Sequence, residues 1–560
     1  MITFRSNSNM SDFRLKGKVA DCFGQKIYHA EIHVSAGRIL SIKALDSQAE
    51  ETDHYILPGF IDAHVHVESS LLLPSEFARL AVTHGTVAIV CDPHEIANVC
   101  GLEGVKYMIE NGKTVPFKFY FGAPSCVPAT LFETVGAHLD AEQVGQLLQL
   151  PEIKYLSEMM NYPGVLNNDP EVMEKIRLAL EFNKPVDGHA PGLRGEKAGF
   201  YIHAGISTDH ECFTLEEALD KLNAGMKILI REGSAAKNFE ALVSLIETHP
   251  DMTMLCSDDK HPDSLVAGHI NRLCARAVEK GFAIFNILRA ACINPVLHYG
   301  LDVGMLRPGD PADFIVVKDL NDFEVIQTYI NGKLLAENGQ TRILHTSHSV
   351  INEFQCGPKH IEDFLYPLMK WGEEENIEQA WVIEALDGQL VTNKLLQPIA
   401  LLSDGKGYLQ SNLEHDLLKI VVVNRYHDAP IAKSFIKNFN LKKGAIASSV
   451  AHDSHNIVAV GVDEYSISRA VNLVIENKGG LCCVSEDEER VLPLPCAGLM
   501  SPLDGYEIAS QYSALDAMAK QMGTTLSAPF MTLSFMALLV IPHLKLSDMG
   551  LFDGDDFRLL

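Results

Sequence analysis

Eight short apolar runs, separated by longer amphipathic segments, constrain the fold of this chain more than any other feature. They follow one another between residues 55 and 260 of the 560-residue chain. Two intervening segments, 171–183 and 214–225, carry apolar residues at helical spacing, and the second ends on Gly225, which favours a helix end. Strand and helix that alternate eight times predict a (β/α)8 barrel. The eight runs read YILPGFIDAHVHV, GTVAIVCDPHE, PFKFYFGAPS, IKYLSEMMN, KPVDGHAPG, GISTDHE, MKILIREGS and MTMLCSDDK.

Short β-structure is predicted on both sides of the barrel. Residues 13–57 alternate apolar and polar residues, and residues 304–340 read as strands again, with a hairpin signal at Asn331–Gly332. The later part of the chain has mixed α/β character, and its clearest helix follows Asp463, a favourable N-cap. The predicted fold class is therefore α/β. It comprises a TIM-like (β/α)8 barrel at 58–303, one small β-sandwich built from 1–57 and 304–345, and a C-terminal mixed α/β domain at 346–560.

The amino-acid composition limits the kinds of molecule that this protein is expected to bind. A formal net charge of −27 argues against nucleic acid or an anionic membrane surface, since both need clustered Lys and Arg. The longest apolar run, 529–544, is shorter than the ~20 residues of a spanning helix and predicts a buried helix or strand pair. The 12 cysteines are scattered without a Cys-x-x-Cys pair, which indicates reduced thiols. We expect a cytoplasmic protein without nucleic-acid or membrane partners, and a homodimer or higher homo-oligomer.

Histidines and carboxylates gather where the predicted barrel strands end. Chemistry in such barrels is located at these ends. Two residues apart on a strand, His64 and His66 point the same way, so both imidazoles can hold one ion. Imidazole and carboxylate suit Zn²⁺, Fe²⁺ or Mn²⁺, and the number of groups predicts two ions bridged by Glu158 and a hydroxide. The candidate metal ligands are His64, His66, Glu158, His189, His210 and Asp258.

Three neighbouring residues allow two interpretations each. Asp259 follows Asp258 at a strand terminus, where it either holds a purine NH or has a structural loop role. His94 and Glu95 follow the second strand. In one interpretation they contact the substrate or act as an acid. In the other they belong to a helix N-terminus that Asp92 or Glu95 caps.

Two further polar groups have structural interpretations that we prefer. Arg231 and Glu232 are adjacent at the end of the seventh strand, where we expect a plain ion pair. The stretch HDSHN at residues 452–456 follows a strand-like run. A loop that reaches over the barrel mouth is one interpretation, and an ordinary polar turn is the preferred one.

The pattern of strand-end ligands resembles the amidohydrolase superfamily. The finer motifs HVHVESS, CDPHEIANV, MMNYPGV, DGHAPGL, TDHE, IREGSA and SDDKHPDSL resemble the adenine deaminase family. So do SSVAHDSHNIVAVG and PLPCAGLMS in the C-terminal part, so that the likeness spans nearly the whole chain. Many hydrolytic amidohydrolases bridge their metals with a carboxylated lysine. Here Lys154 lies four residues before the strand end, which favours Glu158 as the bridge.

This resemblance implies hydrolytic deamination of adenine to hypoxanthine and ammonia (EC 3.5.4.2) by a metal-activated hydroxide, in purine salvage or catabolism. It implies two divalent ions, Mn²⁺ or Fe²⁺, with Zn²⁺ as the alternative. Asp258 and Glu158 are the expected catalytic carboxylates. The implied ligand sets are His64, His66 and Asp258 for the more buried ion and His189 and His210 for the second, with Glu158 as the bridge.

Two other functions stay open at this stage. One is a different amidohydrolase that acts on a cyclic amide or another aminated heterocycle. The other is a non-catalytic barrel that serves as a binding protein. Such a protein would be expected to have lost metal ligands, whereas all six positions here carry ligand residues.

Overall fold

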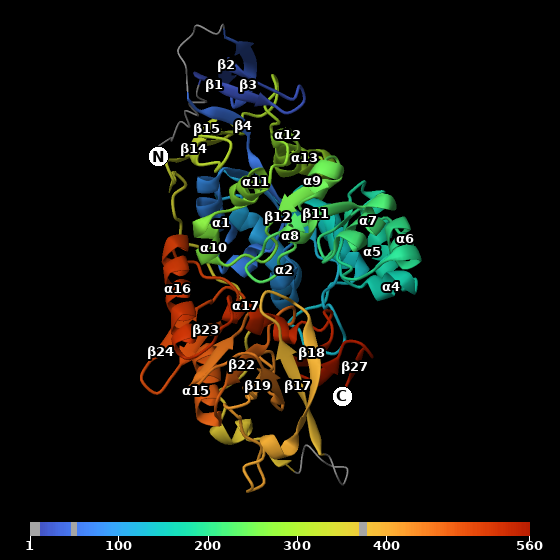
Figure 1. Cartoon of the computed structure of the whole chain (residues 1–560), viewed down its shortest axis with the longest axis vertical. Helices are drawn as coiled ribbons and strands as arrows, with labels where there is room; N and C mark the ends of the chain where they lie inside the picture. Colours follow the sequence, from blue (N-terminus) through green and yellow to red (C-terminus); the bar gives the residue numbers. More distant parts are fainter. Residues whose placement is uncertain (1–11, 46–52, 369–377) are drawn as a thin grey trace, which may run out of the picture.

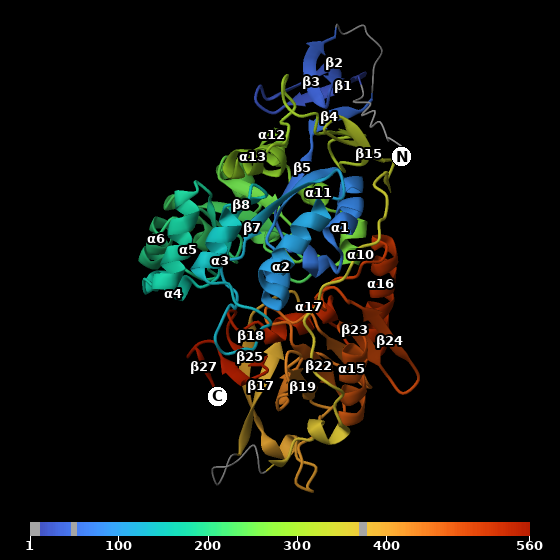
Figure 2. The same cartoon turned by 180° about the vertical axis from the view of Figure 1, so that it is seen from behind.

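The computed structural model describes residues 12–45, 53–368 and 378–560. Three bodies follow one another along the long axis of the molecule (Figure 1). A β-sheet formed by the start of the chain and by β14 (Val325–Ile330) and β15 (Lys333–Glu337) lies at one end, the barrel lies in the middle, and the C-terminal unit lies at the other end. The view from behind gives the same order (Figure 2).

The segments before and after the barrel share one eight-stranded sheet. Its strand order is β16-β15-β14-β13-β4-β1-β2-β3. The two segments meet where β4 pairs antiparallel with β13, from Pro58 opposite Phe314 to Tyr55 opposite Val317. The strands are β1 (Phe13–Asp21), β2 (Lys26–Ser35), β3 (Arg38–Ala44), β4 (Tyr55–Pro58), β13 (Phe314–Val317), β14 (Val325–Ile330), β15 (Lys333–Glu337) and β16 (Gln340–Thr341).

The Asn331–Gly332 hairpin is confirmed. The two residues connect β14 to β15, which pair antiparallel from Ile330 opposite Lys333. Their φ angles are 48° and 70°. Positive φ at both central residues is what a type I′ turn requires, and Asn followed by Gly is the pair that adopts it most readily.

Each of the eight apolar runs supplies one barrel strand. The strands run parallel in the orders β5-β6-β7-β8-β9 and β10-β11-β12. Bridges between Val65 and Asp258 and between Val186 and Ile206 join the two groups and close the barrel. The strands are β5 (Phe60–Val65), β6 (Thr86–Cys91), β7 (Lys118–Ala123), β8 (Ile153–Met159), β9 (Val186–Gly188), β10 (Thr208–Asp209), β11 (Lys227–Arg231) and β12 (Thr253–Cys256).

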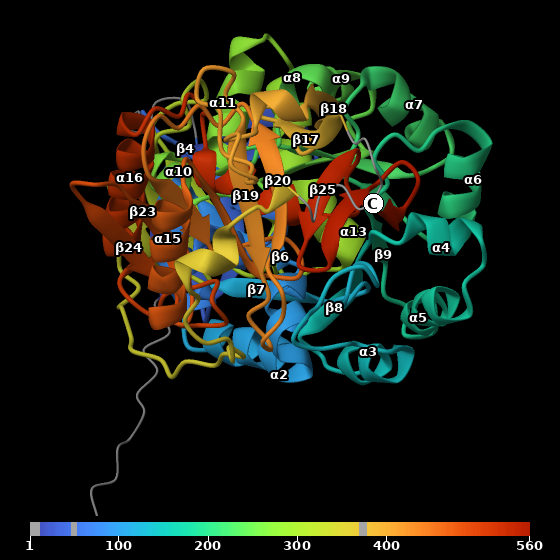
Figure 3. The ribbon, with the colours of Figure 1, turned by 90° about the horizontal axis from the view of Figure 1, so that it is seen from below.

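Helices cover the outside of the barrel, as Figure 3 shows from the side of the C-terminal unit. Polar side chains cap the N-termini of several of these helices. Asp169 accepts the backbone N–H of Val172, and Thr214 accepts that of Glu217. The helices are α1 (Pro74–Ala81), α2 (His94–Gly112), α3 (Ala141–Leu148), α4 (Tyr162–Leu166), α5 (Pro170–Glu181), α6 (Gly195–His203), α7 (Leu215–Asn223), α8 (Phe239–Leu242), α9 (Leu245–Thr248), α10 (Pro262–Ala267), α11 (Ile270–Glu279), α12 (Ile284–Leu288) and α13 (Asn294–Tyr299).

The C-terminal unit is a second mixed α/β structure. Its large sheet has the order β18-β17-β20-β19-β22-β21-β23-β24, and β25 to β27 form a smaller sheet. Asp463 caps α15 by accepting the backbone N–H of Ser466, as predicted. The elements are β17 (Gln379–Ala385), β18 (Thr392–Pro398), β19 (Leu418–Val423), β20 (Ala432–Lys437), β21 (Ala445–Ser448), β22 (Ile457–Gly461), α15 (Glu464–Glu476), β23 (Gly480–Val484), β24 (Glu489–Pro493), α16 (Gly505–Gln521), α17 (Pro529–Ser534), β25 (Leu544–Ser547), β26 (Gly550–Asp553) and β27 (Arg558–Leu559).

The C-terminal unit packs against the barrel through α16 and adjoining loops. The helix contacts α1 and α10. The backbone N–H of Ser501 donates to the carbonyl oxygen of Leu71 at 2.9 Å. The apolar run at 529–544 forms α17 and a following 3₁₀ turn at Phe535–Ala537, both buried, which confirms the helical alternative. Among the described residues, no helix has the length and apolar character needed to cross a bilayer. All twelve cysteines are free thiols.

A buried carboxylate joins the barrel to the first sheet. Asp313 has no exposed surface and accepts hydrogen bonds from Lys118 Nζ at 2.6 Å and from the backbone N–H groups of Gly304 and Asn331. Lys118 begins β7, whereas the other groups belong to the segment after the barrel. This cluster therefore fixes how the sheet sits on the barrel.

We expect Asp313→Ala to lower the free energy of unfolding by about 3–5 kcal/mol, because it leaves a largely buried ammonium group without its partner. Lys318→Ala is the control, because Lys318 pairs with Glu324 at 3.0 Å on the surface, where both side chains are mostly exposed. Thermal unfolding of both variants beside the parent protein measures the effect. A midpoint for Asp313→Ala equal to that of Lys318→Ala would contradict the prediction.

Candidate metal centre

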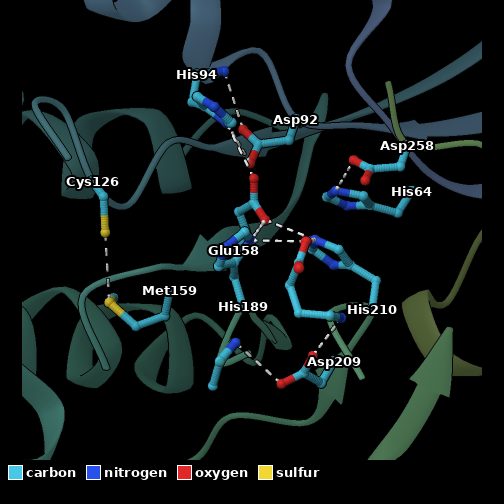
Figure 4. A network of polar contacts seen from close by, with 12 residues as sticks. His64, Asp92, His94, Cys126, Glu158, Met159, His189, Asp209, His210 and Asp258 are labelled. Atoms are coloured by element: carbon cyan, nitrogen blue, oxygen red, sulfur yellow. Dashed lines mark hydrogen bonds and ion pairs between the residues drawn. The ribbon is translucent and has the colours of Figure 1, made fainter. Parts of the chain in front are cut away.

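The barrel brings the six predicted ligands to one buried site. His64 and His66 come from the end of β5, and Glu158 lies in β8. His189 and His210 directly follow β9 and β10, and Asp258 lies two residues after the end of β12. All six are at least nine-tenths buried. Figure 4 shows Glu158 in the middle, with imidazoles on two sides of its carboxylate. The six are His64, His66, Glu158, His189, His210 and Asp258.

Glu158 contacts histidines with both of its carboxylate oxygens. Oε2 lies 2.7 Å from His189 Nδ1 and 3.0 Å from His210 Nε2. Oε1 lies 3.4 Å from His66 Nε2 and 3.5 Å from His94 Nδ1. One carboxylate therefore faces two separate groups of imidazole nitrogens, which is the arrangement that a bridging ligand requires.

Asp258 completes the side of the site formed by β5. Its Oδ1 lies 3.2 Å from His66 Nε2 and 3.6 Å from His64 Nε2. Its Oδ2 accepts a hydrogen bond from Arg231. His66 donates from Nδ1 to the carbonyl oxygen of Asp92 at 3.1 Å, which leaves Nε2 facing the carboxylates.

Both carboxylates are ionised in this environment. Burial raises the pKa of Glu158, but His189 and His210 outweigh it and hold that pKa well below its usual range. Burial likewise raises the pKa of Asp258, but Arg231 and the hydrogen bond with His66 hold it well below its usual range. Each group is therefore available as a ligand and as a proton acceptor.

The histidines differ in their proton affinity. Burial and the neighbouring His210 lower the pKa of His64 well below its usual range. Burial also lowers the pKa of His210, but Glu158 outweighs it and raises that pKa to about 9. Burial lowers the pKa of His66, yet its hydrogen bond with Asp258 raises it well above the usual range. His66 and His210 must therefore release a proton before they can ligate a metal ion.

These residues fit a divalent metal centre. Both ring nitrogens of His64 and the Nε2 of His189 are buried without a hydrogen-bond partner among the described residues. Unpaired buried polar atoms are costly, and a metal ion would satisfy them. Imidazole nitrogens with carboxylate oxygens suit Mn²⁺, Fe²⁺ and Zn²⁺. Several groups of described residues have ligand atoms within 4.8 Å of one another, among them His64, His210 and Asp258; Glu158, His189 and His210; and His66, Asp92, His94 and Glu158.

These groups extend the ligand set expected from the sequence. Asp92 and His94 stand beside His66 and Glu158, and His210 belongs both to a group with His64 and Asp258 and to a group with Glu158 and His189. The signal for Asp92 was its place in the strand-end motif CDPHE, where it was considered only as a helix cap. Which ligand serves which ion stays a prediction.

Asp259 lies in the wall of the same cavity as Asp258. The φ of Asp258 is 57°, in the left-handed region, so the chain turns there and both neighbouring carboxylates face the cavity. Asp259 accepts a hydrogen bond from Ser69 Oγ at 2.5 Å. Its expected contact with a purine stays a prediction.

His94 and Glu95 have different surroundings. His94 Nδ1 lies 3.1 Å from Asp92 Oδ2, while Asp92 Oδ1 accepts the backbone N–H of His94. Asp92 thus bonds the backbone where α2 begins, but Pro93 is the N-cap residue and no side chain caps the helix there, so the expected capping by Asp92 or Glu95 is not found. Glu68 accepts the backbone N–H of Ile96. The carboxylate oxygens of Glu95 instead contact two histidines of the C-terminal unit.

The expected ion pair between Arg231 and Glu232 is wrong. Arg231 binds Glu211 with both terminal nitrogens and also donates to Asp258. Glu232 pairs with Arg276 at 2.7 Å. Successive side chains of a strand point to opposite faces, so neighbours in the sequence do not meet. Glu211 was missed, although it directly follows a predicted ligand in the motif TDHE.

The polar stretch 452–456 reaches the barrel, contrary to the preferred interpretation as an ordinary turn. His452 and Asp453 line the cavity at the barrel mouth. His452 and His455 contact the two carboxylate oxygens of Glu95. Contacts between residues more than 350 positions apart leave no trace in a local sequence pattern, which is why composition alone favoured a turn.

The ligands face a small cavity of about 20 Å³. Barrel residues form its floor, and the C-terminal unit supplies Leu390, Phe535 and Leu538 as apolar walls. Lys545, which is fully buried, donates to the carbonyl oxygens of Leu390 and Phe535 at 2.7 and 2.9 Å. In this structure the cavity has room for about one water-sized group, since such a group needs roughly 10–15 Å³.

Known proteins resemble both parts of the chain. Residues 55–335 match the amidohydrolase family, and residues 389–558 match the adenine deaminase C-terminal domain. The chain is 55% identical over 547 residues to adenine deaminase of Sulfurovum sp. (strain NBC37-1), with 98% of this chain and 99% of that protein covered. It is 51% identical over 552 residues to adenine deaminase of Salinibacter ruber, with 98% and 99% covered.

Similarity to solved structures is lower. Beta-aspartyl dipeptidase from Fervidobacterium islandicum AW-1 has a TM-score of 0.46 and 15% sequence identity, with 60% of this chain and 98% of that chain covered. At that level the barrel assignment rests on the strand order described above.

We expect Mn²⁺ to raise the thermal unfolding midpoint of metal-free protein, because an ion bound only by the folded state stabilises it. The rise should be larger at pH 9 than at pH 6. The reason is that His210, with its pKa raised to about 9, and His66 hold protons at low pH that compete with the ion.

His210→Asn should reduce this shift, whereas His427→Asn, which changes an exposed histidine of the C-terminal unit, should retain it. Calorimetric scans with and without Mn²⁺ measure both effects. Equal shifts in the two variants, or a shift of the same size at both pH values, would argue against the site.

Proposed function

The chain belongs to the adenine deaminase family of the amidohydrolases, and we propose that it hydrolyses adenine to hypoxanthine and ammonia. The observation that carries the proposal is the buried Glu158 carboxylate between imidazoles from four strand ends, at a cavity lined by the barrel and by the C-terminal unit. Relatives named adenine deaminase match almost the whole chain, including the C-terminal unit.

We propose two divalent ions per chain, Mn²⁺ or Fe²⁺, with Zn²⁺ as the alternative. When bound, such ions lower the pKa of a water molecule and supply hydroxide near neutral pH. One ion would be held by His64, His66 and Asp258 and the other by His189 and His210, with Glu158 contacting both.

The carboxylates account for the proton transfers. Hydrolysis adds water at carbon 6 of adenine, and both protons of that water leave its oxygen in the course of the reaction: one ends on the ring nitrogen and the other on the amino group, which departs as ammonia. Asp258, which is ionised and faces His64 and His66, takes the proton of the attacking water and passes it on. Glu158 carries a proton to the ring nitrogen. The buried walls of the cavity exclude other water.

Several features stay predictions for this family member. Asp259 is proposed to hold a purine NH from the cavity wall. The homodimer or higher homo-oligomer, the cytoplasmic location and the domain bounds are also predictions, and sedimentation of the purified protein tests the first of these. The two rival functions, another amidohydrolase and a non-catalytic barrel, have no supporting observation in the site.

An assay of metal-loaded protein tests the proposal directly. Ammonia and hypoxanthine should form from adenine in equal amounts. Hydantoin and dihydroorotate serve as comparison substrates for the cyclic-amide alternative, and both should be poor. Rapid hydrolysis of either comparison substrate with adenine unchanged would replace the proposal by that alternative, and no turnover of any substrate would favour a binding protein.

Glu158→Gln should retain the fold, lose most adenine turnover and bind fewer than two equivalents of metal, because an amide neither bridges two cations nor carries a proton. Glu174→Gln is the control, since Glu174 pairs with Arg177 on the exposed face of α5. Elemental analysis and turnover on the same preparations measure the effect. Near-parental turnover and metal content in Glu158→Gln would disprove the bridging role.

The neighbouring aspartates should behave differently. Asp258→Asn should lower turnover by a factor on the order of 10² or more, the scale of positioned acid–base catalysis. Asp259→Asn should chiefly raise the Michaelis constant and leave the metal content near the parent value. Turnover, Michaelis constant and metal stoichiometry of both variants decide the matter. A severe turnover loss in Asp259→Asn with Asp258→Asn nearly silent would reverse the assignment.

A further inference from the structure

The imidazole of His452 is held in one orientation beside the cavity. Its Nδ1 contacts Glu95 Oε1, and its backbone N–H donates to the carbonyl oxygen of Ser534 at 3.1 Å. One ring face stacks on Phe535, with centroids 4.7 Å apart and planes 18° from parallel. Both rings line the cavity. The position of this side chain is therefore fixed from three directions.

The second ring nitrogen of His452 points to a ligand. His452 is 2% exposed, and its Nε2 has no hydrogen-bond partner among the described residues. The adjacent Asp453 also lines the cavity and has an unpartnered buried oxygen, Oδ2. Buried polar atoms are nearly always hydrogen-bonded, so a pair of unpartnered ones at a cavity marks where a polar ligand binds.

Glu95 and His455 form the support for His452 and not a further cation site. The backbone N–H of Ala451 donates to His455 Nδ1 at 3.3 Å, which places the ring proton on Nε2. Burial lowers the pKa of His455, so the ring is neutral. Its Nε2–H therefore donates to Glu95 Oε2, and no lone pair remains there for a metal ion.

His452 presents a hydrogen-bond donor to the cavity. Burial lowers its pKa, but the Glu95 carboxylate outweighs burial and raises that pKa to about 9. Nδ1–H is used by Glu95, so Nε2–H is the group that faces the cavity. Adenine offers complementary acceptors, the lone pairs of its ring nitrogens N1, N3 and N7.

We propose that His452 of the C-terminal unit is a substrate contact that donates from Nε2–H to a ring nitrogen of the purine, and that Glu95 is its positioning residue. This inference rests on the proposed deamination of adenine and adds a binding role for the second half of the chain. The loop at 451–456 supplies two of the residues that line the cavity, His452 and Asp453.

Kinetics of His452→Asn on adenine provide the first test, with His455→Asn as the matched control, because His455 contacts the same carboxylate but does not line the cavity. Loss of a hydrogen bond from a charged group should lower kcat/KM by about tenfold or more in His452→Asn. The loss in His455→Asn should be smaller, and the metal content of both should match the parent. Equal losses, or a metal equivalent lost with His452→Asn, would overturn the proposal.

Binding of adenine analogues provides the second test and identifies the nitrogen. The probes are 1-deazaadenine, 3-deazaadenine and 7-deazaadenine, measured as competitive inhibitors of the parent protein and of His452→Asn. The analogue that lacks the contacted nitrogen should bind the parent about tenfold more weakly than the others do. It should lose nothing further in His452→Asn, whereas the other two analogues should weaken. Uniform weakening of all three would show that His452 does not contact the ring.

The experiments distinguish a failure of the proposed adenine deamination from a failure of the inference about His452. If the metal-loaded parent protein does not deaminate adenine, the proposed function fails before any variant is compared. If the parent deaminates adenine and His452→Asn matches it on every probe, only the inference about His452 fails.

Discussion

The site depends on one buried carboxylate, Glu158, whose oxygens face His189 and His210 on one side and His66 and His94 on the other. A carboxylate in such a position is costly unless its charge is compensated. The closed barrel provides the compensation, because the ends of β5, β6, β9 and β10 deliver imidazoles to the same axis. The negative charge of Glu158 can therefore be buried because the strands close into a barrel. That charge makes the site suitable for cations.

The negative charge of the second carboxylate, Asp258, is compensated by an arginine. Asp258 shares Arg231 with Glu211, and Arg231 is 1% exposed. One guanidinium at the end of β11 thus compensates two carboxylates that follow β10 and β12, the strands on either side of it, which leaves Oδ1 of Asp258 facing His64 and His66. A buried arginine cannot give up its charge, so this arrangement keeps Asp258 ionised at any physiological pH.

Local patterns predicted the fold well because strand and helix formation are local. The eight apolar runs each form a barrel strand, Asp463 caps its helix, and Asn331–Gly332 forms its hairpin. The six strand-end ligands were found from the same rule, since parallel strands end at one face of the barrel. Their roles as metal ligands and acids stay predictions.

Local sequence patterns could not predict the contacts between residues that lie far apart in the sequence. The partners of Arg231 come from other strands, 20 and 27 positions away. Glu95 meets His452 and His455 across the boundary between the barrel and the C-terminal unit. In the sequence each such residue is an ordinary polar residue, and only packing shows that it lies in a cavity. The C-terminal unit is therefore the part whose contribution to the site was least predictable.

Anomalous diffraction at the manganese edge, from crystals of protein reconstituted with Mn²⁺, tests the central claim most directly. The account predicts two strong peaks per chain at the barrel mouth, each about 2.0–2.3 Å from a different oxygen of Glu158, a distance typical of carboxylate ligands. A single fully occupied peak, or two peaks that both lie out of bonding distance of Glu158, would contradict it.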